Sequence, residues 1–449
     1  MERLKISKYI HRFFETDSEF SEWFGYYNYD TLNYNQTKML CNRAKFDGVT
    51  ITKGMTIELG YYDIPSGKWH HIGESDSFNW QQGAMMQWLP GKGNENKVIY
   101  NCSRNNYLVA VIHDIETGDT KVIDWTIYGI TPDGKKSISL NLERSYWCRA
   151  YHYQSVINPK YDVRVAEDDG IFEIDLEKNT LKRIVDIQNV INIDHEPYFD
   201  KYKHWLEHIM INPTGTKFVF LHRFSPIDNI FLYQTRIFIA NIDGSNLQVI
   251  PDWKEYSWSH FGWQNDNDFC IYSYTRNKKL DAYIQLQKQV TTNSIQIEKN
   301  SQFINQLLIK GIRLIPKWVR KKIKGQTTYY QFYTCDSEGR YKLTANWDQP
   351  IFDIDGHPSF TKDGRYMITD SYPDKKKYQH LIIYDILTKK SVIVGKFYAS
   401  FMGNPASCDL HPKLCVDNEH VVVDSAYNGK HRMIVFKINW DKVKSRISS

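Results

Sequence analysis

Short runs of apolar residues, many alternating with polar ones, recur along the chain and are separated by turn sequences. Residues 97–100, 107–113 and 121–125 are examples, and they are rich in Val, Ile and Tyr. Turns such as Thr-Pro-Asp-Gly at residues 131–134 and Thr-Lys-Asp-Gly at residues 361–364 stand between such runs. Runs of this length and composition predict β-strands, and Asp-Gly turns connect neighbouring strands of one sheet. The pattern therefore predicts an all-β fold built from strand–turn–strand units.

The units repeat about seven times. A hairpin cannot bury its own faces, so such units must pack on one another, and four strands per unit are typical of a propeller blade. We therefore expect a seven-bladed β-propeller over residues 50–449, with residues 1–49 packing on it or closing its ring. The expected blades comprise residues 50–73, 83–125, 127–187, 207–250, 257–344, 356–397 and 409–438.

Composition agrees with strands and bears on the compartment. The chain contains 31 Tyr, 22 Phe and 13 Trp, and aromatic residues favour strands over helices. Its seven cysteines are too few and too scattered for a disulfide framework. The first residues form no apolar signal segment, and no run of about eighteen apolar residues occurs. The expected location is the cytoplasm, peripheral to a membrane if the basic segment described next binds one.

Residues 289–326 interrupt the fifth blade with a basic, partly helical insertion. Seven Lys and Arg side chains lie between Lys310 and Lys324 with no acidic residue among them, and without them the chain is slightly acidic. In residues 303–324 they interleave with Leu, Ile, Trp and Val, which is typical of a helix lying on an anionic membrane surface. A docking helix for a partner protein and a solvated surface helix remain alternatives. No nucleic-acid-binding motif accompanies the basic residues, so we expect no nucleic-acid partner.

Four histidines occupy one place in the repeat. His208, His260, His357 and His411 each stand four residues ahead of a turn that leads into the next strand. Equivalent positions in repeated units become neighbours in space, so these imidazoles are expected to converge at the axial channel. The alternative is that each histidine caps its own strand.

Three imidazoles at a channel mouth would form a site for a divalent metal. His260, His357 and His411 are the candidate ligands, and Cys408 could supply a thiolate as the fourth. Zinc and manganese are the candidate ions, with calcium as a further option. Asp355 and Asp409 could orient the imidazoles through their N–H groups.

The fourth blade offers further candidate residues. His208 could be another metal ligand or a base. His222 and Arg223 follow one another at the end of a strand of the same blade. The Arg223 guanidinium could bind a substrate carboxylate with two hydrogen bonds, or it could form an internal salt bridge.

The histidine-bearing segments resemble a known family. Glu-His-Ile-Met-Ile-Asn-Pro at residues 207–213, Ser-His-Phe-Gly-Trp at 259–263, Gly-His-Pro-Ser-Phe at 356–360 and Asp-Leu-His-Pro at 409–412 look like the blades of oligogalacturonate lyases. The wider resemblance is to seven-bladed polysaccharide lyases, which include the ulvan lyases, and it covers roughly residues 50–440. It implies β-elimination from a uronic acid, with His208 as the base and His260, His357 and His411 as metal ligands.

Elimination also needs groups that bind the substrate and a proton donor for the leaving oxygen. Gln82, Gln87, Arg149 and Tyr151 are the candidates for substrate contacts, and Gln82 and Gln87 could instead supply a metal ligand. His222 and Arg223 are candidate catalytic residues together with His208. Tyr146, Tyr151, Tyr274 and water remain open as the proton donor.

Together these features predict a metal-dependent, lyase-like protein acting on oligo- or polysaccharides that contain uronic acids. The alternative is a non-catalytic propeller that binds an acidic glycan or a protein partner. In that case a membrane-recruited factor in surface polysaccharide assembly would account for the basic insertion.

Overall fold

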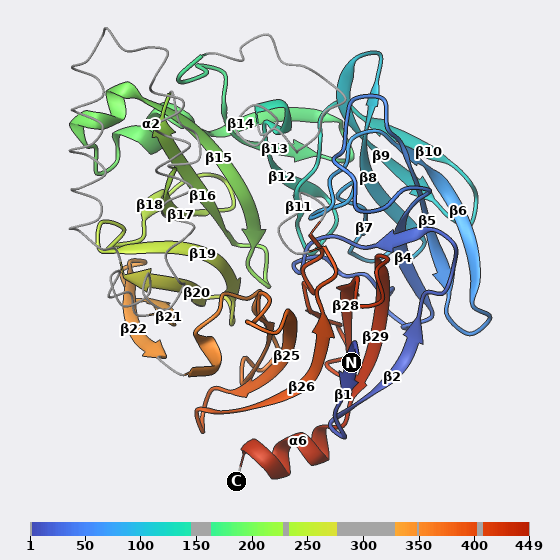
Figure 1. Cartoon of the computed structure of the whole chain (residues 1–449). Helices are drawn as coiled ribbons and strands as arrows, with labels where there is room; N and C mark the ends of the chain where they lie inside the picture. Colours follow the sequence, from blue (N-terminus) through green and yellow to red (C-terminus); the bar gives the residue numbers. More distant parts are fainter. Residues whose placement is uncertain are drawn as a thin grey trace, which may run out of the picture.

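Seven antiparallel sheets are arranged in a ring in the computed structural model, which describes residues 2–144, 163–227, 233–275, 328–347, 350–401 and 407–448 (Figure 1). Five of the sheets each consist of four consecutive strands of the chain, and the other two also include a strand from the N-terminal segment. The prediction of an all-β, seven-bladed propeller is confirmed.

The first four blades take their strands from residues before position 250. They comprise β3 (Ser21–Trp23), β4 (Lys38–Ala44), β5 (Ile57–Asp63) and β6 (Lys68–Ser75); β7 (Gln87–Trp88), β8 (Lys97–Arg104), β9 (Tyr107–Asp114) and β10 (Thr120–Ile123); β11 (Gly129–Ile130), β12 (Lys136–Leu140), β13 (Gly170–Asp175) and β14 (Thr180–Asp186); and β15 (Tyr202–Ile211), β16 (Lys217–Pro226), β17 (Gln234–Asn241) and β18 (Gln248–Val249).

The last three blades follow in the same order. They comprise β19 (Tyr256–Trp263), β20 (Asp268–Thr275), β21 (Thr328–Cys335) and β22 (Tyr341–Trp347); β23 (Ser359–Phe360), β24 (Tyr366–Asp370), β25 (Tyr378–Asp385) and β26 (Lys390–Tyr398); and β27 (Lys413–Leu414), β28 (His420–Ser425) and β29 (Arg432–Ile438). The seventh blade is completed from the other end of the chain.

Two N-terminal strands join the last two blades. β2 (Ile10–Glu15) pairs antiparallel with β29 as the fourth strand of blade seven, and β1 (Leu4–Ile6) extends blade six beside β26 (Figure 1). β3 and β4 then form the two inner strands of blade one. Blade one therefore begins at β3, whereas the sequence predicted its start at residue 50. A three-residue strand such as β3 is too short to show an alternating pattern.

The aromatic residues fill the space between blades. Because sheets pack face to face, the middle strands are buried on both sides, and eight consecutive residues of β16 are buried. Phe218, Phe220 and Phe238 stack with ring centroids 5.8 and 5.6 Å apart. Outer strands such as β22 instead alternate between exposed and partly buried residues. The high aromatic content thus serves the packing between sheets.

The described residues form few helices, and these are short. Those described are α2 (Ile187–Asn192), α6 (Trp440–Ile447) and the 3-10 turns η1 (Pro197–Lys201) and η3 (Pro350–Phe352). Asn439 caps the start of α6, and its side chain accepts a hydrogen bond from the Lys442 amide. Among the described residues, none of the helices has the length and apolar character needed to cross a membrane. The basic segment 303–324 lies outside the described residues, as does the whole expected insertion 289–326.

Candidate functional site

Local irregularities of the backbone place three of the four histidines, His208, His260 and His411. The pairing of β15 with β16 shifts between Glu207 and Met210, and that of β19 with β20 shifts between Trp258 and Phe261. His208 and His260 lie in these β-bulges, which turn side chains out of the regular alternation. His208 has a φ of +54° and His411 a φ of +43°. Non-glycine residues adopt such angles uncommonly and at some cost, chiefly in turns, and functional sites are another place where they occur.

The rings of three histidines from consecutive blades lie beside one another. The ring centroids of His260 and His357 are 4.0 Å apart, and those of His357 and His411 are 4.4 Å apart. Their positions in the sequence span about 150 residues, so the ring of blades brings them together.

The group best suited to hold a metal ion consists of His357, Asp409 and His411. One ligand atom from each lies within 4.8 Å of the other two, and all three residues are buried. Cys408 is not part of this group. Its thiol lies 3.9 Å from the Asp409 carbonyl oxygen, and burial raises its pKa well above the ordinary value, which favours the thiol over the thiolate that binds metals. A carboxylate thus stands in the group where a thiolate was expected.

Both imidazoles of the group are held through Nδ1. His357 Nδ1 lies 2.9 and 3.0 Å from the two carboxylate oxygens of Asp370, and His411 Nδ1 donates to the Gly25 carbonyl oxygen at 2.6 Å. Their Nε2 atoms are buried and have no hydrogen-bond partner among the described residues. Metal-binding histidines commonly donate one ring N–H to an oxygen and use the other nitrogen as the ligand. The residues present therefore fit a metal ion.

His260 borders the group on a side that solvent reaches. Its Nδ1 lies 3.2 Å from an Asp355 oxygen, and the two side chains are 16% and 15% exposed, against 1% for His357. Burial disfavours the charged form of His260, but the carboxylates of Asp355, Asp409 and Asp370 outweigh it and raise the pKa of His260.

Burial also determines the charge states of His357, His411 and the two neighbouring aspartates. It lowers the pKa of His357 and of His411 well below the ordinary value, and each ring's histidine neighbour adds to the effect. Both rings are therefore neutral at pH 7, as metal ligands must be. Burial also raises the pKa of Asp370 to about 6 and that of Asp409 to about 7.

His208 of blade four lies in a separate polar cluster that also includes residues leading into blades two and three. Its Nδ1 is 3.1 Å from the Tyr128 hydroxyl and 3.5 Å from Gln82 Nε2, and its Nε2 is 3.5 Å from a Glu207 carboxylate oxygen. The same Glu207 oxygen pairs with Arg223 at 2.7 Å. The internal salt bridge of Arg223, one of the two expectations for it, is thus present.

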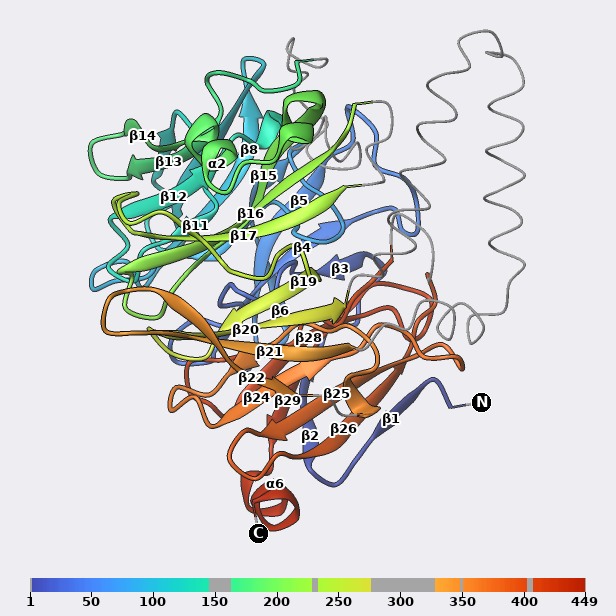
Figure 2. The same cartoon turned by 90° about the vertical axis from the view of Figure 1, so that its left-hand side faces the viewer.

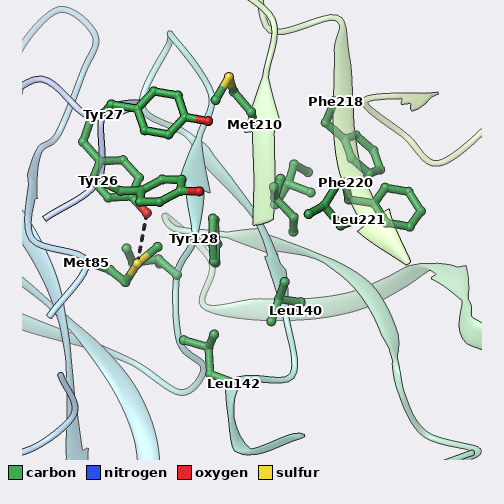
Figure 3. Close-up of a cluster of buried hydrophobic side chains, with 14 of the residues drawn as sticks. Tyr26, Tyr27, Met85, Tyr128, Leu140, Leu142, Met210, Phe218, Phe220 and Leu221 are labelled. Atoms are coloured by element: carbon green, nitrogen blue, oxygen red, sulfur yellow. Dashed lines mark hydrogen bonds between the residues drawn. The ribbon is translucent and has the colours of Figure 1, made fainter. Parts of the chain in front are cut away.

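Tyrosine rings connect His208 with the metal-binding group. The segment that follows β3 crosses toward blades four to seven, and Figure 3 shows Tyr26 and Tyr27 projecting from it in one direction. The Tyr26 ring stacks on His208 at 5.2 Å and meets the His411 ring edge-on at 5.1 Å. The Tyr372 ring, partly exposed, lies 5.9 Å from His260 and 5.8 Å from His357.

Other residues singled out in the sequence lie elsewhere. His222 is fully buried, and its ring nitrogens contact His204 and Arg236 within blade four. Gln87 donates to the backbone oxygens of Met85 and Tyr128. Tyr274 is the next-to-last residue of β20. Arg149, Tyr151 and Tyr146 lie outside the described residues.

Several residues of the site were not singled out from the sequence. Asp370 follows His357 by 13 residues, and Asp424 stands at the same interval after His411, so the repeat did carry a signal for both. Gly25 and Tyr26 precede the recognised blades, and no local pattern connects them with His208 or with His411, which is nearly 400 residues away.

Comparison with known proteins supports the fold. No protein-family model matches the sequence, and no curated protein matches it. An oligogalacturonate lyase in complex with manganese is similar in structure, with a TM-score of 0.59, 14% sequence identity and 98% of each chain covered. A prolyl endopeptidase is less similar, with a TM-score of 0.45 and 10% identity, and the match covers 93% of this chain and 47% of that chain. TolB from Acinetobacter baumannii has a TM-score of 0.38 and 12% identity, and the match covers 89% of this chain and 80% of that chain. The chain is thus a seven-bladed β-propeller with a fold similar to that of an oligogalacturonate lyase.

Proposed function

We propose that this protein is a metal-dependent lyase that cleaves uronic-acid-containing oligo- or polysaccharides by β-elimination. The observation that supports this most directly is the group of His357, Asp409 and His411, in which both imidazoles keep an unpaired, buried Nε2. Unpaired imidazole nitrogens also occur on the buried His420 and His431, but neither belongs to such a group within the described parts of the chain. The similarity of fold to a manganese-containing oligogalacturonate lyase points the same way.

The ligand set favours a hard or borderline divalent ion. Two imidazoles and a carboxylate can bind manganese or zinc, and the thiolate that would have favoured zinc specifically is absent from the group. When bound, the metal would neutralise the uronate carboxylate, so that negative charge can develop there as the neighbouring carbon loses its proton.

His208 is the proposed base. A base acting through Nε2 must carry its own proton on Nδ1, and the Tyr128 hydroxyl oxygen, 3.1 Å away, can accept that hydrogen bond. Gln82 donates to the same hydroxyl at 2.8 Å and so helps to hold it. Glu207, paired with Arg223, lies beside Nε2 and would stabilise the imidazolium formed when the proton is taken.

Tyr372 is the proposed proton donor for the leaving oxygen. Its ring lies against His260 and His357, and it is partly exposed, whereas Tyr26 and Tyr27 are buried. Burial, with the nearby Asp409, raises the pKa of Tyr372 well above the ordinary value. The phenol therefore keeps its proton until a leaving alkoxide takes it.

The test is a spectrophotometric screen of the full-length protein, with Mn²⁺ present, against uronate polymers. Elimination produces an unsaturated uronate that absorbs in the near ultraviolet. We expect turnover by the wild-type protein, and a loss of at least about 100-fold in His208→Ala, the usual contribution of a general base. His195→Ala, which removes a histidine paired with Asp200 at the surface, is the matched control and should keep full activity.

Full turnover by His208→Ala would show that another group takes the proton. A wild-type protein that binds acidic glycans but yields no unsaturated product would instead identify a non-catalytic glycan-binding propeller.

A further inference from the structure

Asp370 and Asp424 occupy the same place in blades six and seven. Asp370 stands 13 residues after His357, and the same interval separates Asp424 from His411. Each lies near the end of the second strand of its blade, β24 or β28. Equivalent positions in repeated units are expected to make equivalent contacts unless another part of the chain intervenes.

Blade six shows the direct contact. The Asp370 carboxylate accepts hydrogen bonds from the backbone N–H of His357 at 2.7 Å and from its ring Nδ1 at 2.9 Å. This arrangement orients the imidazole so that Nε2 points away from the carboxylate and remains available as a ligand.

In blade seven the equivalent carboxylate, that of Asp424, binds the N-terminal segment instead of the histidine. Asp424 accepts hydrogen bonds from the Phe24 amide at 2.9 Å and from the Gly25 amide at 3.0 Å. The Gly25 carbonyl oxygen in turn accepts the His411 Nδ1 proton at 2.6 Å. The carboxylate of blade seven therefore reaches its histidine through a segment about 400 residues away in the sequence.

The Gly25 backbone has little freedom to turn away. Its φ is +135°, and a Cβ placed on it would lie 2.6 Å from the Gln82 carbonyl oxygen. Two residues further on, the Tyr27 hydroxyl donates to the Phe261 carbonyl oxygen of blade five at 2.8 Å. The segment is thus fixed at Asp424 on one side and at blade five on the other.

We propose that Asp424 is a positioning residue of the metal-binding group. By holding the Phe24 and Gly25 amides, it directs the Gly25 carbonyl oxygen at His411 and keeps His411 Nε2 turned toward His357 and Asp409. The proposal rests on the metal-binding part of the proposed function and is independent of the elimination chemistry.

The test compares Mn²⁺ binding to the full-length wild-type protein and its variants by calorimetry. Asp424→Ala should weaken Mn²⁺ binding about 10- to 100-fold, the usual effect of losing an outer partner of a metal ligand. Asp424→Asn should weaken it less, because the amide oxygen can still accept from one of the two N–H groups. Asp169→Ala removes another fully buried aspartate, next to β13 in blade three, and should leave the affinity unchanged.

A second measurement needs no metal. In ¹⁵N-histidine NMR spectra, with His411 assigned by comparison with His411→Ala, the wild-type ring should carry its proton on Nδ1. In Asp424→Asn the signal should shift toward a mixture of tautomers, and this isosteric variant decides the matter if Asp424→Ala does not fold.

The outcomes separate the two proposals. If the wild-type protein binds no Mn²⁺, the proposed metal site is wrong. The tautomer of His411 would still decide whether Asp424 positions that ring. Unchanged affinity together with an unchanged tautomer in Asp424→Asn would overturn the positioning role.

Discussion

His204 and His222 form a buried pair that is separate from the metal-binding group. His204 Nδ1 lies 2.9 Å from His222 Nε2, His222 Nδ1 accepts from Arg236 Nε at 3.1 Å, and His204 Nε2 donates to the Phe199 carbonyl oxygen at 2.9 Å. Every ring nitrogen is used, and each bond is satisfied when both rings are neutral. Burial lowers the pKa of His204 to about 4 and that of His222 well below its ordinary value, with Arg236 adding to the effect at His222.

This pair predicts a loss of stability in mild acid. Below pH 6.5 the unfolded chain binds protons at these histidines while the folded protein does not, so acid favours unfolding. The free energy of unfolding should fall by up to about 1.4 kcal/mol per pH unit for each histidine between pH 6.5 and pH 4. Urea unfolding between pH 7.5 and pH 4.5 measures this change. His222→Phe should reduce the slope of the free energy of unfolding against pH. His11→Asn, at an exposed position, is the control for losing a histidine elsewhere. An unchanged slope in His222→Phe would assign the acid sensitivity to other groups.

Strand geometry explains why His222 and Arg223 do not act together. Neighbouring residues of a strand point to opposite faces of the sheet. His222 therefore faces His204 and Arg236, whereas Arg223 faces Glu207. Their adjacency in the sequence suggested one shared role, and the period of the strand separates them.

At the scale of elements, the segment between β3 and β4 is the part of the site that departs from the repeat. It places Tyr26 between blades and carries the Gly25 carbonyl oxygen to His411. A side chain at position 25 would meet the Gln82 backbone, so the segment depends on glycine there.

Gly25→Ala should therefore be more costly than a similar change in open space. Gly54 also has a positive φ, +91°, but nothing lies within 4 Å of a Cβ placed on it. Gly54→Ala should cost about 1 kcal/mol of backbone strain, and Gly25→Ala at least about 2 kcal/mol together with a loss of Mn²⁺ affinity. Urea unfolding and Mn²⁺ titration of both variants provide the comparison. Equal costs and equal affinities would mean that the segment relaxes without disturbing His411.

At the scale of the whole molecule, the two ends of the chain close the ring. Ile10 of β2 pairs with Ile438 of β29, and Leu4 of β1 pairs with Phe397 of β26 (Figure 2). Blades six and seven thus hold strands from both termini. A ring fastened this way resists opening, because separating one blade pair breaks contacts that are distant in sequence.

The blades and their number could be predicted from the sequence because turns and apolar runs recur in each blade. Residues 1–49 were expected to pack on the propeller or close its ring, but the positions of β1, β2 and β3 within them could not be predicted, since strands of three to six residues show little periodicity. The partners of β1 and β2 also lie at the other end of the chain. The same limit applies to the site. His260, His357 and His411 share a register, so their convergence followed from the repeat, whereas the contributions of Gly25 and Tyr26 depend on ring closure.

The most direct test of the whole arrangement is a crystal structure of the protein soaked in Mn²⁺, with anomalous diffraction recorded. The account predicts one anomalous peak within coordination distance of His357 Nε2, His411 Nε2 and an Asp409 carboxylate oxygen, and its disappearance in crystals of His357→Ala. Crystals with no peak at these three side chains, or with the peak retained in His357→Ala, would contradict it.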